Sequence, residues 1–214
     1  DIIYENGVFA RSFPINIEKT LDNKEHQFSI TKNDYQDTVV MTEKFHQTFE
    51  NAGVMMNGNV FTKRIEPQYE RFIPLRDILD EKSKLEDFVL NENQIEKFKE
   101  LRGAKSKKRK APDGSEYLYT EGSMSPYDSL DLPGRTMLTS ESSVNRSTHI
   151  IMDEVLNAKR FITPIESERL QGFPDDWTDT GMPLKRRYFM MGNALVTGII
   201  SRLESILSEI VTRE

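Results

Sequence analysis

The stretch RFITPIESERLQGFPD, residues 160–175, carries the clearest local signals in this chain of 214 residues. Thr163 and Glu166 have the spacing of a capping box, in which each side chain accepts a hydrogen bond from the backbone N–H of the other. Pro164 lies at the first helical position, where its missing N–H costs nothing. Gly172 can end such a helix. These signals predict a helix that begins at Pro164 and ends near Gly172.

A second segment, GNALVTGI at residues 192–199, opens the last predicted helix. Asn193 is a favourable N-cap residue, and apolar residues recur at helical spacing from Ala194 to about Val211. These apolar positions are Leu195, Ile199, Leu203, Ile206 and Ile210. The first amides of a helix are unpaired and its dipole favours an anion. The segment therefore fits either an anion-binding helix start or an ordinary capped surface helix.

Three patterns in the first eighty residues indicate further elements. Residues 1–20 alternate loosely and predict one strand. The segment AGVMMNGNVFTKRI, residues 52–65, holds two short apolar runs around Asn57-Gly58. Asn-Gly is the strongest short hairpin signal, so we expect a β-hairpin there. Residues 73–80, IPLRDILD, predict a turn into a short helix.

A clearer helix is predicted from Glu92 to Arg102. Asn91 can cap it and Gln94 lies at the third helical position, which completes a second capping box. Gly103 follows the last apolar position of this helix, and we expect it to adopt the left-handed conformation common after a helix.

The segment after this helix is strongly basic. Residues 105–110, KSKKRK, carry five positive charges in six positions. This patch, which runs from Ala104 to Lys110, is either a solvated loop or a loop that contacts phosphate. SEYLYTEGSM, residues 115–124, alternates like a strand. Residues 121–149 are rich in Ser, Thr, Gly and Pro, a composition that favours loops and therefore surface recognition.

Composition excludes several classes of protein. Hydrophobic residues make up 36% and charged residues 30% of the chain, and its net charge is −6. No apolar run is long enough to span a membrane and no signal peptide is visible, so we expect a cytoplasmic setting and no membrane partner. The chain has no cysteine, which excludes disulfides and thiolate metal sites. His26, His46 and His149 lack metal-ligand spacing, so no metal is expected.

The two opening segments together resemble the last two sequence blocks of the DNA (cytosine-5) methyltransferases. The ninth block of that family runs roughly R-x-L-T-P-x-E-x-x-R-L-Q-G-F-P, and the tenth opens with G-N. The matching residues are Arg160, Thr163, Pro164, Glu166, Arg169, Leu170, Gln171, Gly172, Phe173, Pro174, Gly192 and Asn193. Ile162 stands where the family usually has leucine, which keeps the position apolar. The resemblance is strong over residues 160–199 and weaker over residues 73–80 and 134–140.

The other blocks of the family are missing from this chain. These enzymes add a cysteine thiolate to C6 of cytosine, which activates C5 for methylation. The chain has no such cysteine and no Phe-x-Gly-x-Gly, Pro-Cys-Gln or Glu-Asn-Val block, and it begins at Asp1. The resemblance therefore implies the C-terminal portion of a methyltransferase, which is inactive alone. The missing catalytic half would belong to the same polypeptide or to a separate subunit.

The resemblance also implies a fold class and domain limits. We expect an α/β protein in which a mixed α+β target-recognition domain is followed by helices that return to a Rossmann-like methyltransferase domain, most of it absent. Residues 1–20 would be a tail of the catalytic-domain sheet, residues 21–155 the recognition domain, and residues 156–214 the returning helices. Within the ninth block, Glu166 and Arg169 suit ion pairs that fix the returning chain, so its role is expected to be structural.

Ligand sites follow from the same resemblance. The tenth block of the family lies against S-adenosylmethionine, so Asn193, Ala194, Leu195 and Val196 are expected to form a partial site for that cofactor. The partner is double-stranded DNA. Arginine pairs with guanine and asparagine with adenine, so the predicted base contacts are Arg135, Asn145 and Arg146. Further contacts to bases or phosphates are expected from Thr136, Thr139, Ser140 and His149, and contacts to phosphates from Lys107, Lys108, Arg109 and Lys110.

Two other functions stay open. The chain could be the specificity subunit of a split methyltransferase, or a DNA-binding module without chemistry, and the source could be a restriction–modification system. An exposed apolar side along Leu195, Ile199 and Leu203 would favour a chain that needs a catalytic partner. Burial of that side would favour the independent module.

Overall fold

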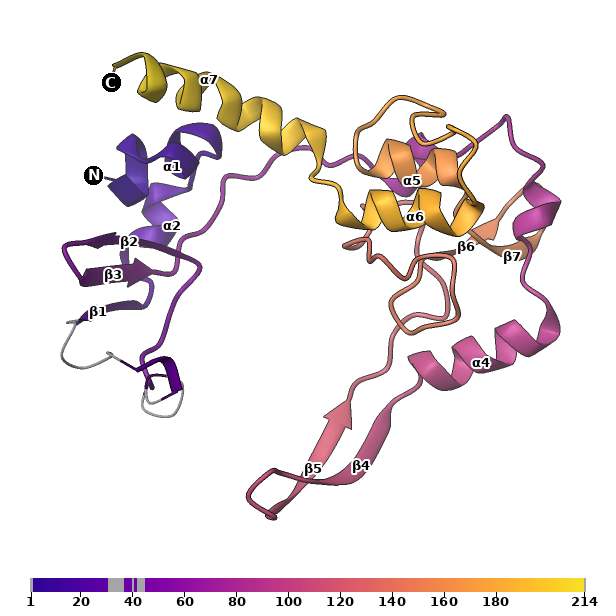
Figure 1. Cartoon of the computed structure of the whole chain (residues 1–214), viewed down its shortest axis with the longest axis horizontal. Coiled ribbons are helices and arrows are strands. Elements are labelled where there is room, and N and C mark those ends of the chain that lie inside the picture. Colours follow the sequence, from indigo (N-terminus) through magenta and orange to yellow (C-terminus); the bar gives the residue numbers. More distant parts are fainter. Residues whose placement is uncertain (1, 31–36, 40, 42–44, 214) are drawn as a thin grey trace. The chain divides into compact units, whose positions relative to one another are not determined.

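The computed structural model describes residues 2–30, 37–39, 41 and 45–213. The chain folds as two compact units, each of which mixes helices and strands. Unit 1 comprises Asp1–Glu70 and Gly198–Glu214, and unit 2 comprises Arg71–Thr197. Figure 1 shows the elements of both units along the chain. The chain is therefore a mixed α/β protein, as its sequence predicts.

Unit 1 contains a three-stranded antiparallel sheet with the order β1-β3-β2. The strands are β1 (Glu25–Ser29), β2 (Ala52–Met56) and β3 (Asn59–Lys63). Asn57 and Gly58 join β2 to β3 with positive φ angles of 50° and 78°. Two consecutive positive φ angles match the twist of a tight hairpin. The hairpin predicted over residues 52–65 is confirmed.

Helical segments accompany this sheet. They are η1 (Ile2–Asn6), α1 (Val8–Ser12), α2 (Ile17–Leu21) and α7 (Thr197–Arg213). The strand predicted within residues 1–20 is therefore wrong, because turn and cap contacts bend this segment into helical turns. The Gly7 N–H donates to the carbonyl oxygen of Ile2 at 2.9 Å. The Asn16 side chain caps α2 by accepting from the Lys19 N–H at 3.1 Å.

Unit 2 contains two antiparallel hairpins and several helices. Its elements are η2 (Leu75–Ile78), η3 (Leu85–Phe88), α4 (Glu92–Arg102), β4 (Lys105–Lys110), β5 (Glu116–Glu121), β6 (Ile150–Asp153), β7 (Ala158–Phe161), α5 (Pro164–Leu170) and α6 (Leu184–Asn193). The short helix expected in residues 73–80 is confirmed as η2. Residues 122–149 form neither a helix nor a strand longer than an isolated bridge, as predicted.

Both predicted capping boxes form. Asn91 and Gln94 cap α4, and Thr163 and Glu166 cap α5. The left-handed conformation predicted for Gly103 is wrong, because its φ is −66° and its backbone is extended. The chain continues almost directly from α4 into β4, and an extended residue provides that change of direction.

The basic patch is also not a loop. Lys105–Lys110 is strand β4, paired in register with Glu116–Glu121 of β5. The strand predicted within residues 115–124 is confirmed as β5. The turn Pro112-Asp113-Gly114 brings β5 back along β4, and Gly114 has a φ of 86°. Figure 1 shows this hairpin extending away from the rest of unit 2.

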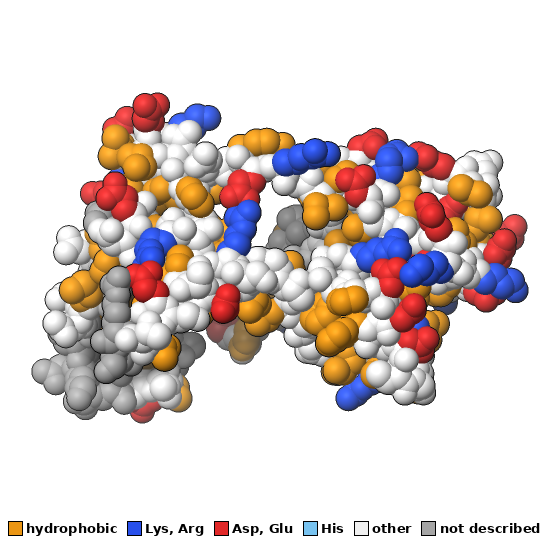
Figure 2. Space-filling view, turned by 90° about the horizontal axis from the view of Figure 1, so that it is seen from above, with side chains coloured by type: hydrophobic (Ala, Val, Ile, Leu, Met, Phe, Trp, Pro, Cys, Tyr) orange, Lys and Arg blue, Asp and Glu red, His pale blue; other side chains and the backbone are white. Residues whose placement is uncertain are grey.

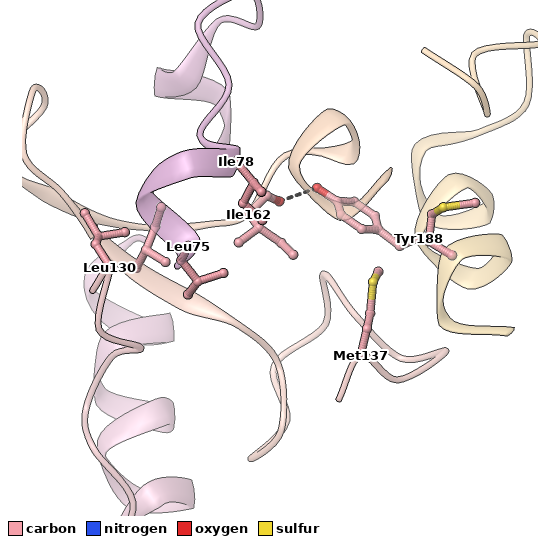
Figure 3. Packing of buried hydrophobic residues seen from close by; sticks show 8 residues of the cluster. Leu75, Ile78, Leu130, Met137, Ile162 and Tyr188 are labelled. Atoms are coloured by element: carbon pink, nitrogen blue, oxygen red, sulfur yellow. Dashed lines mark hydrogen bonds between the residues drawn. The ribbon is translucent and has the colours of Figure 1, made fainter. Parts of the chain in front are cut away.

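The main core of unit 2 brings together helices and hairpins that lie far apart in the sequence. Its buried members are Leu75, Ile78, Leu130, Met137, Ile151, Ile162, Tyr188 and Met191. Figure 3 shows the Tyr188 hydroxyl pointing to the backbone of Ile162, where it donates to the carbonyl oxygen at 2.6 Å. Burial raises the pKa of Tyr188 above its ordinary value, so the hydroxyl stays protonated as a donor. α5 and α6 lie side by side through this core.

Among the described residues, no helix combines the length and the apolar character needed to cross a membrane.

Ile162 tests the packing of this core, because it is 2% exposed between β7 and α5. We expect Ile162→Ala to lower the free energy of unfolding by about 2 to 5 kcal/mol, since it removes apolar atoms and leaves a cavity. Leu132, which is 57% exposed, is the matched control, and Leu132→Ala should change that free energy by less than about 0.5 kcal/mol. Urea denaturation followed by circular dichroism measures both. Equal effects of the two substitutions would contradict the assigned core.

Candidate nucleic-acid interface and cofactor site

The first residue of the ninth-block segment, residues 160–175, is an arginine buried among carboxylates. Arg160 of β7 is fully buried. Its Nε donates to Oδ2 of Asp153 at 2.7 Å, and its two Nη atoms donate to the two oxygens of Glu166, each at 2.7 Å. Burial tends to raise the pKa of Asp153, but the hydrogen bond and positive charge of Arg160, together with the N–H groups of Leu156 and Val155, outweigh burial and hold that pKa below its ordinary value. The Asp153 carboxylate is therefore charged and paired with the Arg160 guanidinium.

The same carboxylate of Glu166 holds a distant segment. It accepts from the Thr163 N–H at 2.8 Å and from the Asp80 N–H at 3.0 Å. The Thr163 hydroxyl donates to Oδ2 of Asp80 at 2.8 Å. These bonds join the segment after η2 to the start of α5. Because all of them are internal and buried, the ninth block has the structural role that its sequence predicts.

Arg169 makes the second predicted ion pair. Its Nε and Nη2 donate to the two carboxylate oxygens of Asp175 at 2.7 and 2.8 Å, and its Nη1 donates to the carbonyl oxygen of Leu79. Hydrogen bonds from Arg169 and Lys82 lower the pKa of Asp175. Trp177 packs beside this turn, 5.8 Å from the Phe173 ring between centroids.

The predicted base contact Arg135 is committed to the protein interior. Its Nε donates to Oδ1 of Asp128 at 2.5 Å, and its Nη1 donates to the Ser147 carbonyl oxygen at 3.0 Å. Arg102 of α4 approaches the other side of Asp128, with Nη2 3.2 Å from Oδ2. Burial tends to raise the pKa of Asp128, but hydrogen bonds from Arg135 and the Ile150 N–H outweigh it, so the pKa is lowered.

Arg146, a second predicted base contact, holds the base of the β4–β5 hairpin. Its Nη1 donates to the Leu101 carbonyl oxygen at 2.9 Å and to Oε2 of Glu121 at 3.3 Å. It also approaches Gly103 at 3.4 Å, and its Nη2 donates to the Gly122 carbonyl oxygen. This guanidinium therefore joins the residues just before β4 to the end of β5.

The third predicted base contact, Asn145, closes its own loop. Its Oδ1 accepts from the N–H groups of Ser147 and Thr148 at 2.9 and 3.2 Å. Its Nδ2 donates to the carbonyl oxygen of Ser140 at 3.1 Å. A base contact through the bonded groups of Asn145, Arg135 or Arg146 would compete with these internal bonds.

The remaining loop candidates divide by exposure. Thr136, Thr139 and Ser140 are exposed, so their side chains are accessible to a ligand. His149 is fully buried, and its Nδ1 lies 3.0 Å from Oε2 of Glu141. The expectation that His149 contacts DNA is therefore wrong, because its ring is enclosed by the protein. Lys107, Lys108, Arg109 and Lys110 are all exposed on β4.

The prediction that Asn193 starts the last helix is wrong. Asn193 is the last residue of α6, and its Nδ2 donates back to the Phe189 carbonyl oxygen at 2.9 Å. Ala194 ends α6 with an extended backbone, and α7 begins only at Thr197. The sequence did not predict α6, because this helix is fixed by burial of Tyr188. Asn193 is therefore not an N-cap, and no helical first turn is formed by residues 194–196.

Leu195 and Val196 remain accessible between the two helices. Leu195 is 70% and Val196 38% exposed. Their backbone N–H groups make no hydrogen bond within the part of the chain that the structure describes. The Thr197 N–H donates to the Gln171 carbonyl oxygen at 3.0 Å, which ties this link to the end of α5. Two free amides on an extended link can still bind an acceptor.

Gly192 brings α6 against the loop of residues 122–149. A Cβ atom on Gly192 would lie 2.5 Å from the Leu138 carbonyl carbon and 2.5 Å from the Thr139 nitrogen. Such distances are shorter than real Cβ contacts, so only glycine permits this approach. The exposed Thr139 and Ser140 are thus positioned directly by the backbone of the segment that leads to Leu195.

Among the described residues, no three histidine, aspartate or glutamate side chains lie close enough together to hold a metal ion.

Comparisons with known proteins identify the class of protein. The model of C-5 cytosine-specific DNA methylases matches residues 10–210. The chain therefore belongs to the C-5 cytosine-specific DNA methylase family. It is 49% identical over 210 residues to the Type II methyltransferase M.Sau3AI of Staphylococcus aureus. That alignment covers 98% of this chain and 48% of the relative, so the chain spans about half the length of the curated relative.

Two solved methyltransferase structures match this chain with TM-scores below 0.5. The S. pombe Dnmt2 methyltransferase matches with a TM-score of 0.48 and 12% identity, over 92% of this chain and 60% of that one. The Entamoeba histolytica methyltransferase EhMeth matches with a TM-score of 0.43 and 14% identity, over 91% of this chain and 56% of that one.

The Arg160 cluster makes stability depend on acid pH. Because the folded pKa of Asp153 lies below its ordinary 3.8, its pairing stabilises the fold above that pH and is lost as pH falls through the lower folded value. Asp153→Asn should cost about 3 kcal/mol at pH 7, because it leaves the buried charge of Arg160 without one of its two partners. It should also flatten the loss of stability as the pH falls below the ordinary pKa of aspartate. Urea unfolding across pH measures both effects. The exposed Asp131 provides the control variant Asp131→Asn, and an unchanged acid slope in Asp153→Asn would contradict the assignment.

Gly192 provides a test of the contact between α6 and the loop. We expect Gly192→Ala to destabilise the chain by about 1 to 3 kcal/mol, because its methyl group must displace the backbone at Leu138 and Thr139. Gly198 is the control, since a Cβ atom there meets no atom within 4 Å. Gly198→Ala lies in α7 and should be neutral or stabilising. Thermal unfolding and the amide NMR shift of Thr139 measure the difference, and an unmoved Thr139 amide in Gly192→Ala would refute the contact.

Proposed function

We propose that this chain is the C-terminal, DNA-recognising portion of a DNA (cytosine-5) methyltransferase and cannot methylate DNA alone. Methylation at C5 needs a cysteine thiolate that adds to C6 of cytosine. The chain has no cysteine among its 214 residues, although it belongs to the methylase family. This observation carries the proposal. The activity would arise when the chain acts with a part that supplies the nucleophile.

The recognition role is proposed for residues 21–155. The two compact units divide this range at Glu70, so it spans parts of both. The part in unit 2 carries the features suited to duplex DNA, which are the cationic strand β4 and the exposed hydroxyls of Thr136, Thr139 and Ser140. Cations bind phosphates independently of sequence, and hydroxyl groups contact phosphates or base edges. The internal bonds described above would help to hold this surface in position; they are made by Arg135, Asn145 and Arg146.

The two ends of the chain are proposed to belong with the catalytic domain. In unit 1, Arg11 of α1 pairs with Glu209 of α7, and the Ser12 hydroxyl donates to the Arg202 carbonyl oxygen at 3.2 Å. Residues 2–20 and the last helix therefore fold in one unit, which suits segments that serve the same domain. Residues 156–197 would lead the chain back from recognition to that body.

The cofactor S-adenosylmethionine would meet this chain at the link between α6 and α7. The free N–H groups of Leu195 and Val196 fit a polar acceptor, whereas the Asn193 side chain is already bonded to its own helix. The residues Asn193, Ala194, Leu195 and Val196 would thus form one edge of the site through their backbone. The bound cofactor supplies the methyl group.

Exposed apolar residues favour a catalytic partner over an independent binding module. Leu195 and Ile199 are 70% and 45% exposed, while Leu203 is half-buried. Leu207 and Val211 continue the exposed side of α7 at 49% and 71%. An apolar stripe of this length on a helix is costly in water unless another surface covers it. A separate subunit or a longer polypeptide could provide that surface.

Reconstitution with the part of the Staphylococcus aureus relative that lies outside the alignment tests the proposal. Transfer of tritiated methyl groups from S-adenosylmethionine to duplex DNA is measured for the chain, for the other half, and for both together. We expect transfer only when both are present. The control is the other half with its nucleophilic cysteine changed to serine, which should abolish transfer.

The outcomes separate the alternatives. Methyl transfer by this chain alone would overturn its proposed dependence on a partner. Sequence-specific DNA binding by the chain without any transfer in the mixture would favour the independent binding module.

A further inference from the structure

The β4–β5 hairpin is a ribbon with no core on either side. Its strands pair over six residues each, from Lys105 opposite Glu121 to Lys110 opposite Glu116. Apart from Lys105, Tyr119 and Glu121, its residues are exposed. A lone two-stranded hairpin is only marginally stable in water, and without a buried face its register is weakly specified. Both faces of this ribbon are therefore open to a ligand.

Cations occupy both faces of this ribbon. Residues directly opposite each other share a face and successive residues alternate between faces. Lys105, Lys107 and Arg109 therefore lie on one face, and Lys108 and Lys110 on the other. On the face that Figure 2 shows, most blue side chains have red ones beside them. On the ribbon, Glu121 and Glu116 stand opposite Lys105 and Lys110, whereas the residues opposite Lys107, Lys108 and Arg109 are uncharged. A ribbon that is cationic on both faces suits a space with negative charge on two sides.

The first face also carries aromatic groups. Tyr117 stands opposite Arg109 and is 48% exposed. The guanidinium carbon of Arg109 lies 3.9 Å from the centroid of the Tyr119 ring. The Tyr119 hydroxyl donates to Glu121 at the base of the ribbon. Stacking on a ring that is itself anchored restricts the guanidinium plane while leaving its outer N–H groups free to donate.

The base of the ribbon is held firmly to unit 2. Arg146 joins Leu101, Gly103, Glu121 and Gly122 through one guanidinium, as described above. Both strands therefore leave the body of unit 2 from a fixed point beside the loop of residues 122–149. A six-residue strand reaches about 20 Å from there.

We propose that the β4–β5 ribbon enters the major groove of duplex DNA and that Arg109 contacts a guanine there. The inference rests on the proposed function. The major groove is about 12 Å wide and admits a two-stranded ribbon, whereas the minor groove is about 6 Å wide and does not. The Arg109–Tyr117 face meets the base edges, where arginine pairs with guanine through O6 and N7. Lys108 and Lys110 on the other face reach the phosphates that line the groove. This assigns Arg109 to specificity, where its sequence context predicts only phosphate binding.

Selection from a random-sequence duplex library, with the chain and its variants, tests the assignment. Arg109→Ala should lose the preference for guanine at one position and bind the wild-type duplex about tenfold more weakly. Arg109→Lys keeps the charge but not the paired donors, and should lose the same preference. The double variant Lys108→Ala, Lys110→Ala should keep the selected sequence and weaken binding to every duplex, with a salt dependence reduced by about two phosphate contacts. Lys97, which lies exposed near Glu96 and Glu100 of α4, provides the control Lys97→Ala.

Chemical interference locates the groove. Methylation of guanine N7, which faces the major groove, should block binding, and methylation of adenine N3 in the minor groove should not. The inference is overturned if Arg109→Ala selects the wild-type sequence, or if only minor-groove methylation interferes, while DNA binding itself survives. If the wild-type chain binds no duplex, the proposed function fails and the inference falls with it. Circular dichroism of each variant confirms that the exposed substitutions leave the fold intact.

Discussion

The pairing of Arg160 with Glu166 and Asp153 is the constraint on which unit 2 depends. A guanidinium and two carboxylates taken out of water cost several kcal/mol each unless their charges and hydrogen bonds are satisfied together. That requirement fixes the β6–β7 hairpin, the first turn of α5 and the segment at Asp80 in one arrangement, because each provides a partner that no other segment can replace. Removal of any one partner leaves a buried charge unpaired, and the cost of its desolvation is then no longer offset.

The same arrangement reaches the binding surface through a short series of contacts. Ile162 lies between Arg160 and the cap of α5, and its side chain packs in the core. Its carbonyl oxygen accepts a hydrogen bond from the Tyr188 hydroxyl. Tyr188 fixes α6, and the backbone of α6 touches the recognition loop at Gly192. The position of the exposed loop hydroxyls therefore depends on packing around a buried ion pair. One set of contacts therefore joins the buried ninth block to the loop that is proposed to bind DNA.

Local signals in the sequence predicted those elements whose causes are local. Capping boxes at Asn91 and Thr163 and the Asn57-Gly58 turn need only neighbouring residues, and all three form. Asn193 was misassigned because an asparagine can cap a helix or end one, and burial of Tyr188, which no short window reveals, decides between them. Arg135 was assigned to DNA because the sequence does not distinguish an arginine with free donors from one that is bonded within the protein. Its partner Asp128 is only seven residues away, but the folded loop brings the two together.

The arginines of unit 2 divide by what their donors already bind. Arg102, Arg135 and Arg146 use their guanidinium groups to join loops and strand ends, and a redirected donor would leave a carbonyl or carboxylate unsatisfied inside the protein. Arg109 is anchored by a ring instead, and a ring satisfies no N–H group. Binding capacity must therefore reside where the fold has left donors unused. The ribbon is one such place, and Arg135 and Arg146 help to hold it and its neighbouring loop in position.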